Sequence, residues 1–135
     1  MPPGDEAQRV ASEPEPDALA FPKAVRLRRR AEFLRVQERG LKISAECVLV
    51  LVLPNERADG LTRAGFTVSS KVGNAVVRNR IRRRLRELYR SRRAGLPKGL
   101  DMVFIARNSA ATAEWATFVK AFDKVAAELK RKFPQ

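Results

Sequence analysis

A segment that is apolar on one side and almost wholly cationic on the other constrains the fold more than any other part of the sequence. Residues 78–93 contain nine arginines and one acid, Glu87. At about 100° per residue, one stripe of a helix here is apolar and an adjacent stripe is basic. The apolar stripe is Val77, Ile81, Leu85 and Leu88, and the basic stripe is Arg78, Arg82, Arg86 and Arg90. We therefore predict a helix over residues 74–90, with Asn74 as its N-cap, that packs on one side and presents arginines on the other.

The arginines lower the stability of the helix that carries them. Three Arg–Arg pairs spaced four residues apart each cost about 0.2–0.5 kcal/mol, and positive charge in the first turns also opposes the helix dipole. An ordinary solvated helix is the alternative, but such helices usually mix both signs of charge. A guanidinium grips a phosphate through two hydrogen bonds and also stacks on a base, whereas an ammonium acts as a point charge. The segment therefore favours a phosphate-rich partner.

Composition indicates a folded, basic protein that lacks the usual catalytic side chains. The 135 residues include 28 Lys+Arg, 15 Asp+Glu and no histidine, which gives a charge of +13, and 44% are hydrophobic. This charge favours a polyanion, either nucleic acid or an anionic membrane. Without histidine, Ser-His and Cys-His nucleophile pairs and His-ligated metals are excluded. Scattered carboxylates and the lack of a Gly-rich phosphate loop give no sign of autonomous catalysis.

Charge divides the chain into two parts. Residues 1–20 hold five acids against one Arg9, which leaves a net charge of −4 there and +17 in the remainder. We expect residues 1–21 to be an acidic, proline-rich, disordered extension and residues 22–135 to be one RNA-binding domain. The acidic start is not a signal peptide, and the longest apolar run is too short to span a membrane. A cytoplasmic protein without a membrane partner is expected.

Periodicity before the arginine segment predicts one helix and a few strands. A helix is expected over residues 30–39, ended by Gly40. Strand signals cover residues 43–53, and turn residues separate them from a second run over residues 64–69. We expect these two runs to be antiparallel neighbours. Cys47, inside the first run, is expected to be a buried apolar residue.

The remainder of the chain predicts another strand and a final helix. The strand is expected over residues 102–107. Thr112 is expected to cap a helix whose apolar residues recur at helical spacing. These are Trp115, Phe118, Val119, Phe122, Val125, Ala126 and Leu129. The expected fold class is a small α+β sandwich with helices on a mostly antiparallel sheet.

The sequence around the arginines resembles a known signature. Residues 69–83, Ser-Ser-Lys-Val-Gly-Asn-Ala-Val-Val-Arg-Asn-Arg-Ile-Arg-Arg, are similar to the Arg-Asn-Arg signature of the bacterial ribonuclease P protein subunit. Residues 26–40 resemble the N-terminal helix of that family, and residues 101–107 resemble its last strand. The resemblance implies an α-β-β-β-α-β-α sandwich similar to domain 2 of ribosomal protein S5. It also implies a left-handed β-α-β crossover, which is rare.

The resemblance implies a function as well. In this family the protein joins a catalytic RNA, one protein per RNA, that removes the 5′ leader from precursor tRNA. The RNA performs this endonucleolytic chemistry with Mg²⁺ that it mainly holds itself, so the protein alone is expected to be inactive. By position, the contacts to RNA carry over to Lys71, Arg78, Asn79, Arg80, Arg82, Arg83 and Arg86.

A leader-binding cleft between the N-terminal helix and the sheet is also implied. Its residues here are Phe33, Gln37, Leu49 and Leu51. Gln37 and Leu51 stand where family members often carry aromatic residues. Because stacking is worth about 1–3 kcal/mol per base, leader binding in this chain is expected to depend on backbone charge and apolar contact instead.

Other functions fit parts of the sequence. A ribosomal or general RNA-binding or chaperone module without a role in cleavage would require the same charge. A protein-only nuclease fits less well, because histidine is missing and the acids are scattered. The acidic extension either shields the basic surface before assembly or has no function of its own.

Overall fold

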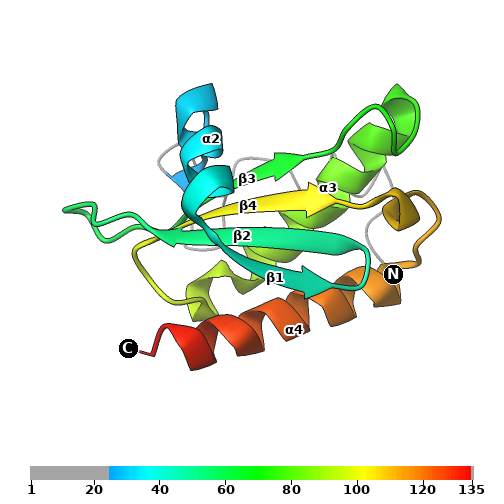
Figure 1. Ribbon diagram of the computed structural model, residues 1–135. Coiled ribbons are helices and arrows are strands. Elements are labelled where there is room, and N and C mark those ends of the chain that lie inside the picture. Colours follow the sequence, from blue (N-terminus) through cyan, green and yellow to red (C-terminus); the bar gives the residue numbers. More distant parts are fainter. Residues whose placement is uncertain (1–24, 135) are drawn as a thin grey trace.

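The major helices and strands of the chain follow one another in the order α-β-β-β-α-β-α (Figure 1). The computed structural model describes residues 25–134. The major elements are α2 (Arg30–Arg39), β1 (Leu41–Ala45), β2 (Val48–Pro54), β3 (Arg63–Thr67), α3 (Ala75–Arg92), β4 (Leu100–Ala106) and α4 (Trp115–Lys132). Two short 3-10 turns, η2 (Arg93–Gly95) and η3 (Asn108–Ala111), flank β4. The expected α+β class and element order are confirmed, and the predicted extension over residues 1–21 lies outside the described residues.

The four strands form one sheet in the order β1-β2-β4-β3. β2 pairs antiparallel with β1 and with β4, whereas β3 pairs parallel with β4. In Figure 1 both β3 and β4 point to the right, β4 lies below β3, and α3 returns behind the sheet. The β3-α3-β4 crossover is therefore left-handed, against the strong right-handed preference of such units.

One strand expectation was wrong. The run over residues 43–53 holds two strands, because it turns at Glu46 and Cys47, and the backbone of Glu46 takes a φ of 41° to close the hairpin. The run over residues 64–69 is not an antiparallel neighbour of this hairpin, because β4 inserts between β2 and β3. Alternating or apolar runs identify strands, but they do not specify which strands pair.

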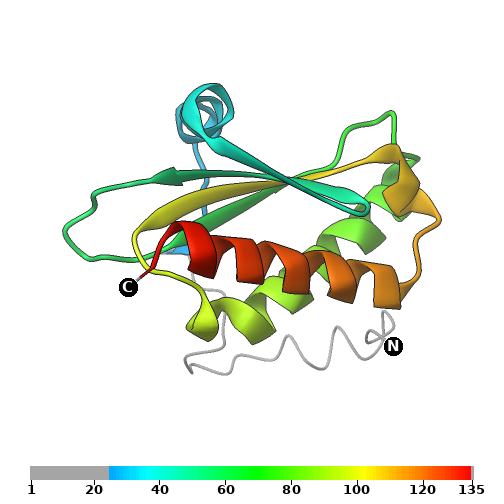
Figure 2. The same cartoon turned by 60° about the horizontal axis from the view of Figure 1, so that its bottom comes forward.

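Alternate residues of the central strands face different layers. Val48, Val50 and Val52 of β2 belong to the large core beneath α3 and α4. Leu51 and the partly buried Leu49 belong to a smaller core beneath α2. Figure 2 shows this arrangement, with α2 above the sheet and α3 beside α4 below it. The sheet is thus buried on both faces, which explains why β2 is apolar without interruption.

The predicted N-cap is correct for α3 but not for α4. Asn74 caps α3 as expected, and its Oδ1 accepts the Val77 N–H at 3.0 Å. α4 begins at Trp115 after Glu114, rather than after Thr112, because η3 intervenes and Thr112 ends that turn. Cys47 is buried as expected, and burial raises the pKa of its thiol.

Candidate RNA interface

The packing of α3 divides its arginines into two groups. Ile81, Leu85, Leu88 and Tyr89 are buried beneath the helix and fix its rotation. The arginines on one flank turn toward α4, and those on the other flank turn toward the β3 edge of the sheet. The helical spacing fixes this division, because Arg78, Arg82 and Arg86 fall on one side of the buried stripe while Arg80 and Arg84 fall on the other.

The arginines toward α4 hold the two helices together. The Arg80 guanidinium donates to the Ala111 carbonyl at 3.2 Å, and Arg84 donates to the Ala113 carbonyl at 3.1 Å. The same Arg84 guanidinium lies 5.5 Å from the centre of the Phe118 ring. Arg92 pairs with Asp123 of α4 at 3.4 Å. Part of the arginine content of α3 is therefore explained by packing.

Arg90, the last member of the predicted basic stripe, pairs with Glu87 of the same helix at 2.7 Å. Five other α3 residues form a basic surface that we call the α3 arginine face. It comprises Arg78, Asn79, Arg82, Arg83 and Arg86. The Arg82 guanidinium donates to Asn79 Oδ1 at 3.1 Å, and Arg78 Nε donates to the Gly73 carbonyl at 3.1 Å, so these side chains are held in position. Fixed guanidinium groups lose less entropy when they bind an anion.

Electrostatics on the α3 arginine face favour an anion near Arg86. Partial desolvation lowers the pKa of Arg86, and the positive charges of Arg26 and Arg82 lower it further. Arg26 belongs to the segment before α2, which extends the sheet along β3: Leu27 N–H donates to the Ala64 carbonyl at 2.9 Å. Cations from two separate segments therefore meet at this flank, and a phosphate there would relieve their repulsion.

The structure places five of the seven predicted RNA contacts on the α3 arginine face. Lys71 is exposed in the turn that leads into α3, where its N–H donates to Ser69 Oγ at 3.3 Å. Arg80 lies on the opposite flank, against η3. The sequence pattern had grouped Arg80 with the others because the Arg-Asn-Arg signature places it beside them in the chain.

A second candidate surface lies at α2. A hollow of about 360 Å³, which we call the α2 hollow, is lined by Arg28, Arg30, Phe33, Leu34, Gln37 and Thr67. Phe33 and Gln37 are thus brought together, whereas Leu51 is only 4% exposed and Leu49 is half-buried beneath α2. The helix covers this face of β2, so the two leucines support the hollow rather than line it. Sequence reasoning missed Arg28, Arg30, Leu34 and Thr67, although three successive arginines at residues 28–30 were a signal.

Two contacts position α2 over the sheet. Glu32 accepts the backbone N–H groups of Arg28 and Arg29, both at 3.1 Å, and pairs with Arg63 of β3 at 2.7 Å. Burial alone would raise the pKa of Glu32, but these backbone donors and Arg63 outweigh it and lower the pKa below its ordinary value. On the other side, the Phe33 ring rests on Gly65, where an added Cβ would lie 2.5 Å from Phe33 Cε2. Only glycine allows this approach.

Within residues 25–134, three or more His, Cys, Asp or Glu side chains nowhere gather closely enough to hold a metal ion. The most buried acid, Asp101, is occupied by hydrogen bonds from Arg63 and Asn55. Over the same residues, every helix is too short or too polar to cross a membrane. The candidate functional surfaces described above are the α3 arginine face and the α2 hollow.

Comparison with known proteins identifies the family of the chain. A family model described as Ribonuclease P matches residues 21–130 of the chain. The chain belongs to the ribonuclease P protein family. As a ribonuclease P protein component, it takes part in tRNA processing within a ribonucleoprotein that contains RNA.

Relatives and solved structures of ribonuclease P proteins extend over most of the chain. The ribonuclease P protein component of Citrifermentans bemidjiense is 45% identical over 113 residues, which cover 84% of this chain and 89% of that protein. The ribonuclease P protein component of Desulfovibrio desulfuricans is 44% identical over 109 residues, which cover 81% of this chain and 80% of that protein. The RNase P protein of Staphylococcus aureus matches with a TM-score of 0.71 at 27% identity, over 82% of this chain and 99% of that chain. The Thermotoga maritima RNase P protein gives a TM-score of 0.66 at 32% identity, over 78% and 96%.

Proposed function

We propose that the protein binds the catalytic RNA of ribonuclease P through the α3 arginine face. The observation that carries this proposal is that Arg78, Arg82 and Arg86 line one flank of α3. Arg80, Arg84 and Arg92 are used instead in contacts with η3 and with α4 and the turn before it. Hydrogen bonds already hold Arg78 and Arg82, so they are oriented before RNA arrives. Guanidinium groups arranged this way suit the phosphates of a folded RNA.

The α2 hollow is the proposed site for the 5′ leader of precursor tRNA. Phe33 offers an aromatic edge and Leu34, which is 40% exposed, offers an apolar contact, while Arg28 and Arg30 supply charge for the backbone. A groove with cations and one ring suits a single strand with little sequence preference. Binding of the leader then depends more on charge than on base stacking, because Gln37 stands where a second aromatic side chain could have been.

Cleavage is assigned to the RNA. Mg²⁺ prefers oxygen ligands in octahedral geometry, and in proteins it is usually held by carboxylates together with phosphates. The described residues do not fit a protein-held Mg²⁺, because within residues 25–134 no three His, Cys, Asp or Glu side chains gather closely enough to hold a metal ion. Asp101 and Glu32 are in addition paired with Arg63. The proposed role of the protein is to raise the affinity of the catalytic RNA for precursor tRNA. One protein would bind each RNA, and the complex would act in the cytoplasm.

The deciding experiment is cleavage of precursor tRNA by the cognate catalytic RNA at low Mg²⁺, with and without the protein. We expect stimulation by the protein, and no cleavage by the protein alone. Failure to stimulate the cognate RNA would overturn the proposal. Cleavage by purified protein without RNA would overturn the assignment of chemistry to the RNA.

A binding experiment separates this role from general RNA binding. With the catalytic RNA present, affinities for precursor tRNA and for leaderless mature tRNA are compared. The proposal expects tighter binding only for the precursor, and Phe33→Leu, which keeps apolar volume but removes the ring, should reduce that difference. Equal affinities for the two tRNAs would favour a general RNA-binding module instead.

A further inference from the structure

Glu32, in the first turn of α2, makes separate contacts with its two carboxylate oxygens. Its Oε1 accepts the backbone N–H groups of Arg28 and Arg29, both at 3.1 Å. Its Oε2 accepts Arg63 Nη1 at 2.7 Å, so one side chain connects the start of α2 with β3. A glutamine side chain has only one acceptor oxygen. A carboxylate is therefore needed at this position if both contacts are to be kept.

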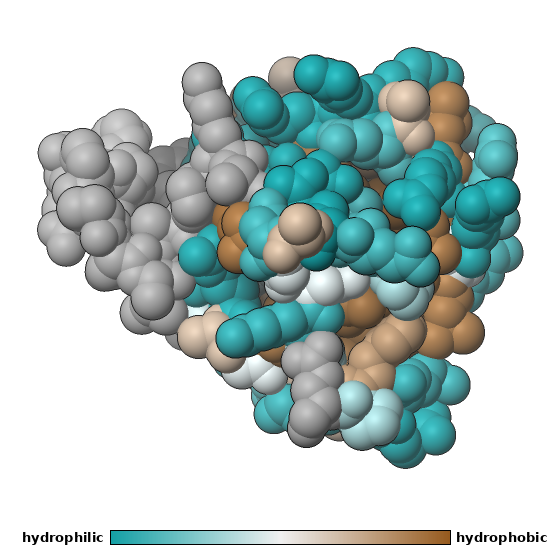
Figure 3. All heavy atoms as spheres, turned by 90° about the vertical axis from the view of Figure 1, so that its left-hand side faces the viewer, coloured by the Kyte–Doolittle hydropathy of each residue, from teal (hydrophilic) through white to brown (hydrophobic). Residues whose placement is uncertain are grey.

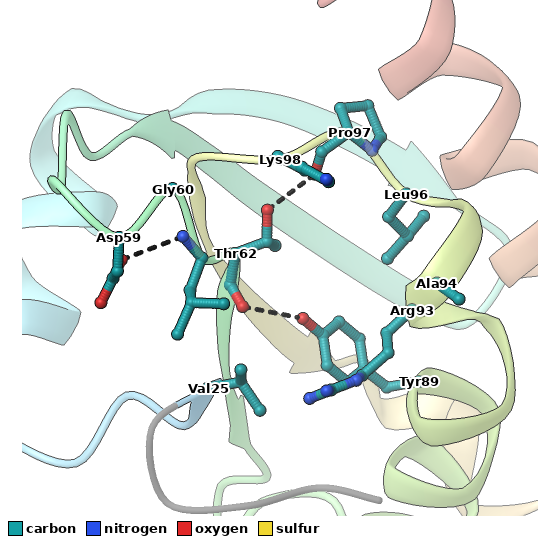
Figure 4. A pocket seen from close by; sticks show the side chains of 11 residues that line it. Val25, Asp59, Gly60, Thr62, Tyr89, Arg93, Ala94, Leu96, Pro97 and Lys98 are labelled. Atoms are coloured by element: carbon teal, nitrogen blue, oxygen red, sulfur yellow. Dashed lines mark hydrogen bonds between the residues drawn. The ribbon is translucent and has the colours of Figure 1, made fainter. Parts of the chain in front are cut away.

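Arg63 is itself well connected at the start of β3. Its Nη2 donates to Asp101 Oδ2 at 2.7 Å, and that carboxylate is buried. The preceding residue, Thr62, donates its hydroxyl to the Pro97 carbonyl at 2.6 Å (Figure 4). The same hydroxyl oxygen accepts the Leu100 N–H at 3.2 Å. The guanidinium that binds Glu32 therefore extends from a part of the sheet that several hydrogen bonds hold in place.

The remaining contacts of α2 are few. The buried residues of the core beneath α2 are Leu27, Val36, Leu51 and Val103. Most other side chains of this helix are exposed. Figure 3, which shows the molecule from the left of Figure 1, has hydrophilic side chains over most of its upper part, where α2 lies. Apolar packing thus holds the middle of the helix, and the contacts of Glu32 hold its start.

The backbone that Glu32 holds carries the cations of the α2 hollow. Arg28 and Arg30 line this hollow beside Phe33, and both arginine side chains are exposed. Long exposed side chains have many rotamers, so the average position of each charge depends on where the backbone is held. A segment that becomes ordered only on binding lowers affinity, whereas one that is ordered beforehand does not. The hold on this backbone therefore bears directly on the affinity of the hollow for an anionic strand.

We propose that Glu32 is a positioning residue for the 5′ leader: supported by Arg63, it fixes the backbone of residues 28–30 so that the arginines there face the phosphates of the leader. The proposal rests on the proposed function, which assigns the leader to the α2 hollow. Glu32 does not contact the RNA in this role, because both of its oxygens bind groups of the protein. Removal of its charge should therefore weaken leader binding, although it makes the surface more positive.

NMR relaxation of the full chain without RNA tests whether Glu32 fixes this segment. In Glu32→Gln we expect the backbone order parameters of residues 28–30 to fall from about 0.85, typical of rigid backbone, to below about 0.6. The amide of Leu27, which donates to the Ala64 carbonyl at 2.9 Å, should keep its value. Glu38→Gln, at an exposed position of the same helix, is the matched control and should change none of these values. Unchanged order parameters at residues 28–30 in Glu32→Gln would overturn the proposal.

The affinity gained from the leader tests the function of this hold. With the catalytic RNA bound, dissociation constants are measured for precursor tRNA and for mature tRNA, and their ratio gives the contribution of the leader. Glu32→Gln should reduce this contribution about three- to tenfold, because the segment must then become ordered on binding. Glu38→Gln removes the same charge and should leave the contribution unchanged or raise it. An unchanged or raised contribution in Glu32→Gln, as charge alone predicts, would overturn the proposal.

Two further measurements separate positioning from a general loss of folding and from failure of the proposed function. A folding defect in Glu32→Gln would also weaken binding to the catalytic RNA and to mature tRNA, and we expect both affinities to stay close to those of the parent. Loss of all three affinities together would contradict a positioning role. Equal affinities of the parent for precursor and mature tRNA would contradict the leader site itself. A leader contribution in the parent that Glu32→Gln leaves intact would contradict the role of Glu32 alone.

Discussion

Arg63 holds the buried carboxylate of Asp101 through two parallel hydrogen bonds, from Nε to Oδ1 at 2.9 Å and from Nη2 to Oδ2 at 2.7 Å. Asp101 is 1% exposed and also accepts Asn55 Nδ2 at 3.0 Å. The same guanidinium pairs with Glu32 of α2. One arginine therefore connects β3, β4 and the helix that walls the α2 hollow.

Removal of the Arg63 guanidinium should destabilise the protein strongly. Arg63→Ala leaves the Asp101 charge buried without its main partner, and breaking a buried pair from one side costs about 3–5 kcal/mol. The free energy of unfolding in urea measures this loss. Arg57→Ala, which breaks the exposed pair with Asp59, is the matched control and should change stability little. Similar losses of unfolding free energy for the two variants would show that the buried Arg63–Asp101 pair stabilises the fold no more than the exposed Arg57–Asp59 pair does.

The charge on Glu32 should make part of the stability dependent on pH. Its folded pKa lies below the ordinary value of 4.5, so its contribution is present above about pH 4.5 and is lost as pH falls through the folded pKa. Glu32→Gln should therefore cost about 1–2 kcal/mol at pH 7, where hydrogen bonds to a charged group are lost. The difference between the parent and the variant should shrink toward pH 3, as measured by urea unfolding. Glu38→Gln, on the same helix but exposed, is the control and should change the free energy of unfolding little at pH 7.

The close approach of Phe33 to Gly65 should tolerate no added methyl group. Gly65→Ala forces the ring and α2 outward, and overpacking of this kind costs about 1–3 kcal/mol. Thermal unfolding gives the cost, and the chemical shifts of α2 amides report the displacement. Gly95→Ala, where an added Cβ meets nothing within 4 Å, is the control. If Gly65→Ala left the α2 shifts unchanged, the packing described for Phe33 would be wrong.

The two flanks of α3 should contribute differently to RNA binding. Arg82→Ala/Arg86→Ala should weaken binding to the catalytic RNA and reduce the slope of affinity against salt by about one unit per lost phosphate contact. The measurement is a salt titration of the dissociation constant.

A matched variant on the other flank controls for lost charge. Arg84→Ala/Arg92→Ala removes two charges from the same helix, but these side chains contact Phe118 and Asp123 of α4. We expect this variant to lose stability while its salt slope stays close to that of the parent. An equal reduction of the slope in both variants would contradict a distinct α3 arginine face.

Local sequence patterns specified the helices well. Residues 30–39 form α2 with the expected bounds, and Asn74 caps α3 as predicted. These features depend on neighbours within a few residues, so the sequence displays them directly. The α3 segment was also read correctly as packed on one side and basic on the other.

Features that depend on residues far apart in the chain could not be predicted from local sequence patterns. Arg63 and Asp101 are 38 residues apart, and an acid at the start of an apolar strand was the only sign of their contact. The insertion of β4 between β2 and β3 depends on the left-handed crossover, which no local pattern encodes. The roles of Arg80 and Arg84 needed the position of α4, because a count of arginines does not distinguish packing from binding.

The division of β2 between two cores restricts how this family can vary in length. An insertion or deletion of a single residue within β2 would turn the β2 residues on one side of it to the opposite face of the sheet, so that valines there would face α2 and leucines would face α3 and α4. The loop between β2 and β3 carries no such alternation. Length changes in related chains should therefore accumulate in that loop and be absent from β2, even where individual residues of β2 differ.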